Sequence, residues 1–128
     1  MLTETLRFQK ERPVINQNNG CWAATLIHLL GEVAELEEEA AAYFDGLARE
    51  EDVVSEACDV INFCVALIDS LGFDPQKALQ GKNLRNNDKY PIEELQEGDY
   101  DTKMKELKYR WDVHKKTENV IYMSPARL

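Results

Sequence analysis

Residues 31–40 read GEVAELEEEA and residues 55–63 read SEACDVINF, and these two stretches decide the fold. Apolar residues recur at helical spacing through each of them, over 26–36 in the first case and over 53–68 in the second. The dipeptide Asp45-Gly46 interrupts the pattern between them and predicts a turn. The sequence therefore predicts two long helices paired as an antiparallel hairpin.

The rest of the chain also favours helices. Residues 2–12 predict a short first helix, and Asp74 with Pro75 predicts the start of a third that runs to about Asn87. After an acidic, turn-like segment at 92–101, the apolar spacing of Met104, Leu107 and Trp111 predicts a last amphipathic helix. Residues 120–123, VIYM, could form a short strand.

We expect an all-α helical bundle of four to five helices in a single domain, residues 1–128. Its core should span 20–91, and 92–128 should be a C-terminal extension with one helix.

Composition narrows the classes of partner. The 128 residues carry a net charge of −9, which argues against binding nucleic acid or an acidic membrane through a basic surface. No apolar run is long enough to cross a bilayer, so we expect a soluble, cytoplasmic protein. Cys21, Cys58 and Cys64 form no CxxC pair and are interpreted as reduced thiols in the core.

Two acidic pairs lie on the predicted hairpin. Glu32 with Glu35, and Glu56 with Asp59, are each three residues apart, so each pair aims two carboxylates at one point. The pairs are about equally far from the turn, which should bring all four to one level. Clustered carboxylates repel one another, by about 4 kcal/mol at 4 Å and an effective dielectric of 20, so we expect a cation among them.

Ligands that are all oxygen atoms favour Mg²⁺, with Mn²⁺ as a second possibility. The alternative is that residues 31–40 form a solvated acidic helix face, as most Glu-rich stretches do. His28, one turn before Glu32, is interpreted as a surface residue.

A basic stripe follows on the third predicted helix. Lys82, Arg85, Asn86 and Lys89 recur at spacings of three, four and seven, which suits a polyphosphate. The alternative is a solvated basic helix end that the helix dipole favours.

Together with ALQGKNLRNNDKYP at 78–91, the two acidic stretches resemble the MazG-like all-α nucleoside triphosphate pyrophosphohydrolases, including the dCTPase-type members. The resemblance covers residues 31–91. It implies cleavage of a nucleoside triphosphate to a monophosphate and pyrophosphate, and a dimer or a dimer of dimers. It also implies two or three Mg²⁺ ions per site, and it assigns Glu32, Glu35, Glu56 and Asp59 to them.

The resemblance further implies that Lys82, Arg85, Lys89 and Tyr90 contact the phosphates or the sugar, with Asn86 in the same block. We expect a water molecule to attack the α-phosphorus in line and Glu35 to orient it.

Base recognition is expected from the loop before the first long helix. Asn16 and Asn19 offer amide hydrogen bonds, and Trp22 and Phe63 offer stacking rings, although core packing is the stronger interpretation of both aromatic residues. Purine and pyrimidine both stay open, with a preference for guanine nucleotides (GTP or dGTP) over dCTP or dUTP.

Two other classes of protein use similar residues. A ferritin-like di-iron bundle needs two Glu-x-x-His elements, which His28 and His114 do not complete. A non-catalytic helical interaction protein that binds a metal structurally would explain the acidic pairs but leaves the basic stripe unexplained.

Overall fold

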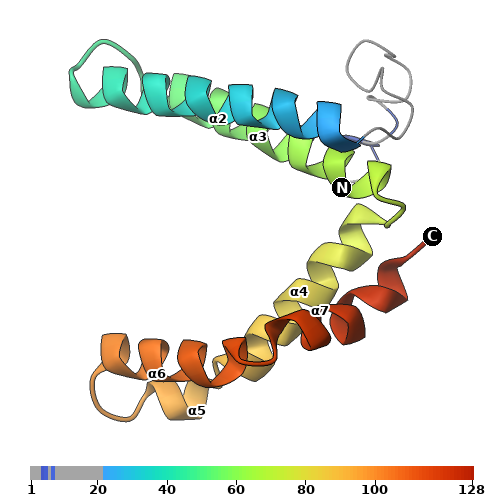
Figure 1. The fold of residues 1–128 in the computed structure, drawn as a ribbon. Coiled ribbons are helices and arrows are strands. Elements are labelled where there is room, and N and C mark those ends of the chain that lie inside the picture. The colour runs from blue at the N-terminus through green and yellow to red at the C-terminus, as the bar shows by residue number, and fades with distance from the viewer. Residues whose placement is uncertain (1–3, 6, 8–21) are drawn as a thin grey trace. The chain divides into compact units, whose positions relative to one another are not determined.

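The computed structural model describes residues 4, 5, 7 and 22–128, and within them the secondary structure is helical (Figure 1). Six α-helices, α2 to α7, and a terminal 3-10 helix follow one another along 22–128. None of the described helices is both long and apolar enough to cross a membrane. The chain divides into two compact units, residues 1–72 and 73–128, and each is described by itself.

The first unit contains a helical hairpin. Helix α2 (Trp22–Phe44) is joined by a short turn to α3 (Glu50–Ser70). Gly46 adopts a φ of 75° in the turn, a conformation that residues with a Cβ rarely adopt. The backbone N–H of Arg49 donates to the Asp52 carboxylate at 2.9 Å, which begins α3 with a capping interaction.

The hairpin buries little apolar surface between its own helices. Only Thr25 of α2 and Val65 and Ala66 of α3 are fully buried among the described residues. The stripe that runs from Leu26 to Leu36 is half-buried on the side that packs against α3. Two helices alone cannot enclose a full core, so much of their apolar surface stays exposed.

The second unit begins with α4 (Pro75–Lys89), whose N-cap Asp74 accepts a hydrogen bond from the Lys77 backbone N–H at 3.0 Å. The short α5 (Ile92–Leu95) and then α6 (Tyr100–Asp112) follow. Helix α7 (Lys115–Met123) and the 3-10 helix Ser124–Ala126 return along α4.

Helices α4 and α7 run antiparallel and in close contact. The Asp74 backbone N–H donates to the Ala126 carbonyl at 2.8 Å at one end, and Arg85 pairs with Glu118 nearer the other. Between them, Gly81 lies so close to the Tyr122 carbonyl oxygen that a Cβ at this position would overlap it.

Several expectations from the sequence are confirmed and others are corrected. The all-α class and the turn at Asp45-Gly46 are confirmed. The third helix runs to Lys89, close to the predicted end at about Asn87, whereas residues 92–128 contain three α-helices instead of one. Residues 120–123 lie in α7 and form no strand, because packing against α4 outweighs the β-propensity of their side chains.

Residues 22–128 by themselves contain six α-helices, which exceeds the four to five expected for the chain. The boundary between the two units, at residues 72 and 73, falls inside the predicted core of 20–91.

Two predictions of core placement are wrong. Cys58 is exposed on α3, whereas Cys64 is half-buried, and both are free thiols. Trp22, the first residue of α2, is 49% exposed. Cys58 and Trp22 both lie on helix surfaces that the hairpin itself does not cover. Cys21 and most of the predicted helix at 2–12 lie outside the described residues.

Candidate metal centre

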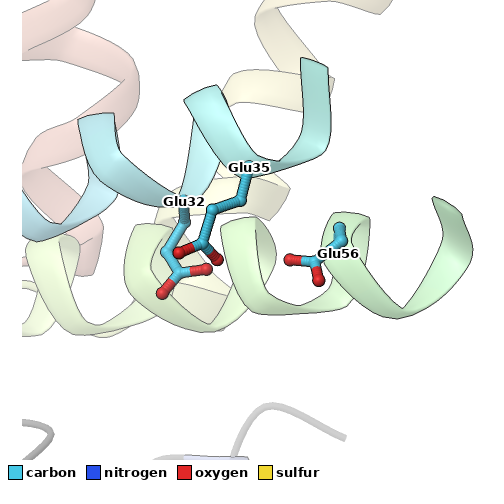
Figure 2. A group of neighbouring side chains, drawn as sticks. All are labelled: Glu32, Glu35 and Glu56. Carbon is cyan, nitrogen blue, oxygen red and sulfur yellow. The ribbon is translucent and has the colours of Figure 1, made fainter. Parts of the chain in front are cut away.

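Three carboxylates converge on the hairpin of the first unit. Glu32 and Glu35 extend from α2 toward α3, the helix that carries Glu56 (Figure 2). One carboxylate oxygen from each residue lies within 4.8 Å of the others. The spacing of three along α2 and the antiparallel pairing of α3 produce this convergence, as the sequence predicted for these three residues.

The charges in this cluster oppose ionisation of its members. Partial burial raises the pKa of Glu32, and the neighbouring carboxylate of Glu35 and then those of Asp59 and Glu56 raise it further. Partial burial also raises the pKa of Glu56, followed by the charges of Glu35, Asp59 and Glu39. Both groups are therefore held in surroundings where a negative charge is unfavourable.

Two carboxylate oxygens of the cluster lack a partner among the described residues, and a bound cation would supply one. Glu32 Oε2 and Glu56 Oε2 are buried and have no hydrogen-bond partner within the described part of the chain. None of the ion pairs in that part joins a Lys, Arg or His to Glu32, Glu35 or Glu56. A buried, unpartnered carboxylate oxygen is costly, so the donor set fits a hard divalent ion.

The fourth predicted ligand, Asp59, is nearby but outside this group of three. It is half-buried on α3, one turn after Glu56, and its charge acts on both Glu32 and Glu56. Of the three that converge, Glu35 is exposed and the other two are half-buried. The sequence predicted all four carboxylates as ligands, and the geometry brings Glu32 and Glu35 together with Glu56.

An aromatic pair lies one helical turn from the carboxylates. The rings of His28 on α2 and Phe63 on α3 stack with their centroids 5.9 Å apart and an interplanar angle of 25°. His28 is exposed, as expected, and Phe63 is half-buried. The two amides predicted to read the base, Asn16 and Asn19, lie outside the described residues.

The predicted basic stripe on α4 lies in the second unit, where much of it is occupied by carboxylates. Arg85 is 1% exposed and binds Glu118 through Nε at 3.0 Å and Asp112 through Nη2 at 3.5 Å. Lys89 Nζ binds Asp112 at 2.7 Å. These two cations join α4 to α6 and α7.

The other members of the stripe differ in their surroundings. Lys82 and Asn86 are half-buried on α4, and Tyr90 caps the helix with Lys89 Nζ 5.1 Å from its ring centroid. Partial burial lowers the pKa of Lys82, and the charges of Arg85, Lys115 and Lys89 lower it further. Lys82 is thus the predicted phosphate ligand that lacks a carboxylate partner among the described ion pairs.

Sequence reasoning missed the acidic residues that occupy this stripe. Asp112 and Glu118 are 23 to 33 residues from the cations they bind, and no spacing rule connects positions so far apart. The tail of the chain carried no motif, so neither residue was singled out.

The chain matches no family model, no curated protein and no solved structure.

Proposed function

We propose that the chain is a divalent-cation-dependent nucleoside triphosphate pyrophosphohydrolase. The reaction is hydrolysis of a nucleoside triphosphate to a nucleoside monophosphate and pyrophosphate. The observation that carries the proposal is the convergence of Glu32, Glu35 and Glu56 on one hairpin, with two buried carboxylate oxygens that have no hydrogen-bond partner among the described residues. The acidic and basic sequence blocks at 31–40, 55–63 and 78–91 support the same reaction class.

Glu32, Glu35, Glu56 and Asp59 are the residues that would hold Mg²⁺, with Mn²⁺ as the alternative ion. Carboxylate oxygens suit these hard cations, and the raised pKa values of Glu32 and Glu56 make a positive partner favourable. When bound, two or three such ions supply positive charge for the phosphate oxygens and acidify the attacking water.

The protein's own contribution to the chemistry is to place a water molecule and accept its proton. Glu35 is the most exposed of the three converging carboxylates, so it is our candidate for this role. The water oxygen forms a bond to the α-phosphorus, the bond to the β-phosphate bridging oxygen breaks, and pyrophosphate leaves with the electron pair. The proton released by the water passes to Glu35.

The base would stack near the end of the hairpin at which α2 begins. Phe63 lies one turn beyond Asp59, and Trp22 presents an exposed ring at the start of α2. We keep Asn16 and Asn19 as the proposed hydrogen-bonding partners of the base, with guanine as the preferred base.

The hairpin also favours self-association into a dimer or a dimer of dimers. Exposed apolar residues recur along α2 at spacings of three, four and seven, and a similar stripe follows α3: Ala23, Ile27, Leu30, Ala34 and Ala41, then Val54, Cys58 and Ile61. Ile27 is 70% exposed and Leu30 is 60% exposed. Such a second stripe is what a four-helix bundle of two hairpins requires.

The proposal is tested by incubating the protein with the eight common ribo- and deoxyribonucleoside triphosphates and Mg²⁺ or Mn²⁺. We expect monophosphate and pyrophosphate in equal amounts, fastest with guanine nucleotides, and no turnover after chelation with EDTA. Release of single phosphates, or turnover of none of the eight, contradicts the reaction. Binding of Mg²⁺ without turnover would instead support a non-catalytic metal-binding protein.

Glu56→Gln is the variant that tests the site. It removes a charge and keeps the volume, so kcat should fall at least about 100-fold while the helical circular dichroism spectrum is retained. Glu38→Gln is the matched control, because Glu38 is exposed on α2 and is not among the carboxylates that act on Glu32 or Glu56. Equal activity of the two variants would refute the assignment of Glu56.

A further inference from the structure

Positive charge is concentrated along α6 and the start of α7. Counting histidine as neutral, residues 103–116 contain six cations and two acids, which gives this segment a net charge of +4 (six minus two). Because the whole chain has a net charge of −9, the other residues together carry −13 (−9 minus 4). The segment therefore attracts anionic groups that come within about 8 Å of it, the screening length at physiological salt.

One side of α6 is hollowed. Leu107, the residue that α6 buries, is 1% exposed, and the hollow lies on the other side of the helix, which faces solvent. It is an open cavity of about 480 Å³, and we call the residues that line it the α6 face: Lys105, Lys108, Tyr109, Asp112 and Val113. Counted from the first of them, the spacings are three, four, seven and eight, which place all five on one side of the helix.

The two lysines of the α6 face have no carboxylate partner within the described residues. None of the ion pairs in that part of the chain involves Lys105 or Lys108. The carboxylate of Asp112, on the same face, already accepts from Lys89 Nζ at 2.7 Å and from Arg85 Nη2 at 3.5 Å. Its negative charge is thus offset inside the fold, and the α6 face presents a net positive charge to solvent.

The α6 face also has an apolar part. Tyr109 and Val113 are four residues apart, so their side chains are neighbours on the helix surface, and they are 82% and 65% exposed. Exposed tyrosine rings are enriched at the centres of protein interfaces, where they supply contact area. A ligand that matches the whole face brings apolar atoms as well as negative charge.

The size and charge of the α6 face favour a protein segment over a larger anionic surface. Residues 105–113 span about 12 Å along the helix axis, at ~1.5 Å per residue. A nucleic acid or an anionic bilayer extends far beyond this length and would also experience the net negative charge of the rest of the chain. A short acidic segment meets the local positive charge alone.

We propose that the α6 face is a docking site for an acidic segment of a partner protein. Carboxylates of the segment pair with Lys105 and Lys108, and an apolar side chain of the segment enters the cavity beside Tyr109 and Val113. The site lies on the C-terminal extension and is independent of the proposed hydrolysis of nucleotides.

The test is fluorescence anisotropy of a labelled synthetic peptide, titrated with the full-length protein without nucleotide or metal. The peptide has about 12 residues, all glutamate except for a leucine at every fourth position, so that its leucines lie on one helical face. We expect a Kd of about 100 μM or tighter at ~0.05 M NaCl, and an affinity at least about fivefold weaker at ~0.5 M NaCl, because salt screens the charges.

Two variants separate the charged and apolar parts of the site. The double change Lys105→Glu and Lys108→Glu should weaken binding at least about tenfold, because it replaces two attractions by two repulsions. Tyr109→Ala should weaken it at least about threefold through the loss of apolar contact. Both changes affect exposed side chains, and an unchanged helical circular dichroism spectrum verifies that the fold is retained.

Two further variants are matched controls. Lys77→Glu makes the same change of charge at an exposed position of α4, outside the α6 face, and should leave the affinity within about twofold. The double change Lys105→Arg and Lys108→Arg keeps both charges and should also stay within about twofold, because a guanidinium pairs with carboxylates.

Several results would overturn the proposal. They are no binding of the peptide by the unaltered protein, equal losses in Lys77→Glu and in the double glutamate variant, and equal affinity for a peptide in which lysine replaces every glutamate. Binding to vesicles of phosphatidylcholine and phosphatidylserine, or to single-stranded polythymidine, without binding of the acidic peptide would assign the α6 face to a lipid surface or a nucleic acid instead.

Discussion

At the scale of single residues, the charges of this chain lie in two contrasting environments. Glu32 and Glu56 lie among other carboxylates, and partial burial, followed by the charges of those carboxylates, raises their pKa values. Asp112 has the opposite surroundings: its carboxylate accepts from Lys89 Nζ at 2.7 Å and from Arg85 Nη2 at 3.5 Å. The first environment favours binding of a cation, and the second stabilises the fold.

Asp112 should make the second unit sensitive to acid. The hydrogen bond from Lys89 holds the pKa of Asp112 below its ordinary value of 3.8, and the charge of Lys89, the hydrogen bond from Arg85 and the charge of Lys115 act in the same direction. A carboxyl group whose pKa is lowered by folding stabilises the protein above the ordinary pKa and loses this effect as the pH falls through the lowered one. Asp112→Asn should therefore lower the melting temperature at pH 7.

The measurement is thermal unfolding of both proteins by circular dichroism from pH 7 down to about pH 3. The gap between their melting temperatures should be widest at pH 7 and should shrink below about pH 4, where the Asp112 carboxyl group of the unfolded chain begins to take up its proton while that of the folded protein is still ionised. Glu97→Gln, an exposed residue outside these ion pairs, is the control and should show no gap. A gap for Asp112→Asn that is the same at every pH would contradict the electrostatic explanation.

At the scale of elements, the extension after Pro91 is an integral part of the second unit. Helix α7 and the 3-10 helix pack along α4, and α6 contributes Leu107, which is 1% exposed. The close packing of α7 on α4 depends on Gly81, because a Cβ at this position would overlap the Tyr122 carbonyl oxygen of α7. Helix propensity alone would favour alanine at this position.

Gly81→Ala should therefore destabilise the protein even though alanine is the better helix former. The added methyl group meets the Tyr122 carbonyl oxygen, a backbone atom that cannot move without shifting α7, and we expect a loss of about 1–3 kcal/mol in the free energy of unfolding. Urea denaturation measures it.

Gly31 provides the control for this change. It is also in the interior of a helix, but a Cβ there would meet nothing within 4 Å. Gly31→Ala should raise the free energy of unfolding by about 0.5–1 kcal/mol through helix propensity. If both variants change the free energy of unfolding in the same direction, Gly81 is not packed against the Tyr122 carbonyl oxygen as closely as the structure indicates.

At the scale of the whole molecule, the main physical problem is the apolar surface of the α2–α3 hairpin. Few of its residues are fully buried, while Leu30 and Ile61 are 60% and 55% exposed. Monomeric soluble proteins rarely leave such continuous stripes uncovered. We proposed above that a second copy of the hairpin covers them.

Sedimentation equilibrium tests this proposal. The unaltered protein should have the mass of a dimer or a tetramer. The double change Leu30→Lys and Ile61→Lys should shift it toward the monomer, because burying unpaired ammonium groups in an apolar interface is costly. Tyr109→Lys is the control, since Tyr109 is 82% exposed on α6, outside the hairpin. A monomeric unaltered protein, or a double variant of unchanged mass, would contradict the proposal.

Much of this organisation could be predicted from local sequence. The 3.6-residue periodicity determines α2, α3 and α4, and Asp45-Gly46 and Asp74-Pro75 determine where they turn and begin, because these signals act over a few residues. The spacing of three in Glu32 and Glu35 likewise determines that their carboxylates point the same way. With the antiparallel turn, it predicted that Glu56 would meet them.

Only the tertiary structure decided what depends on distant residues. It placed Asp59 outside the converging three, exposed Trp22 and Cys58, and made residues 120–123 a helix by packing them on α4. It also brought Arg85 and Lys89, which the resemblance assigns to phosphate contact, into ion pairs with Asp112 and Glu118. The reason is that burial and ion pairing are set by contacts across 20 to 30 residues, which no local periodicity encodes.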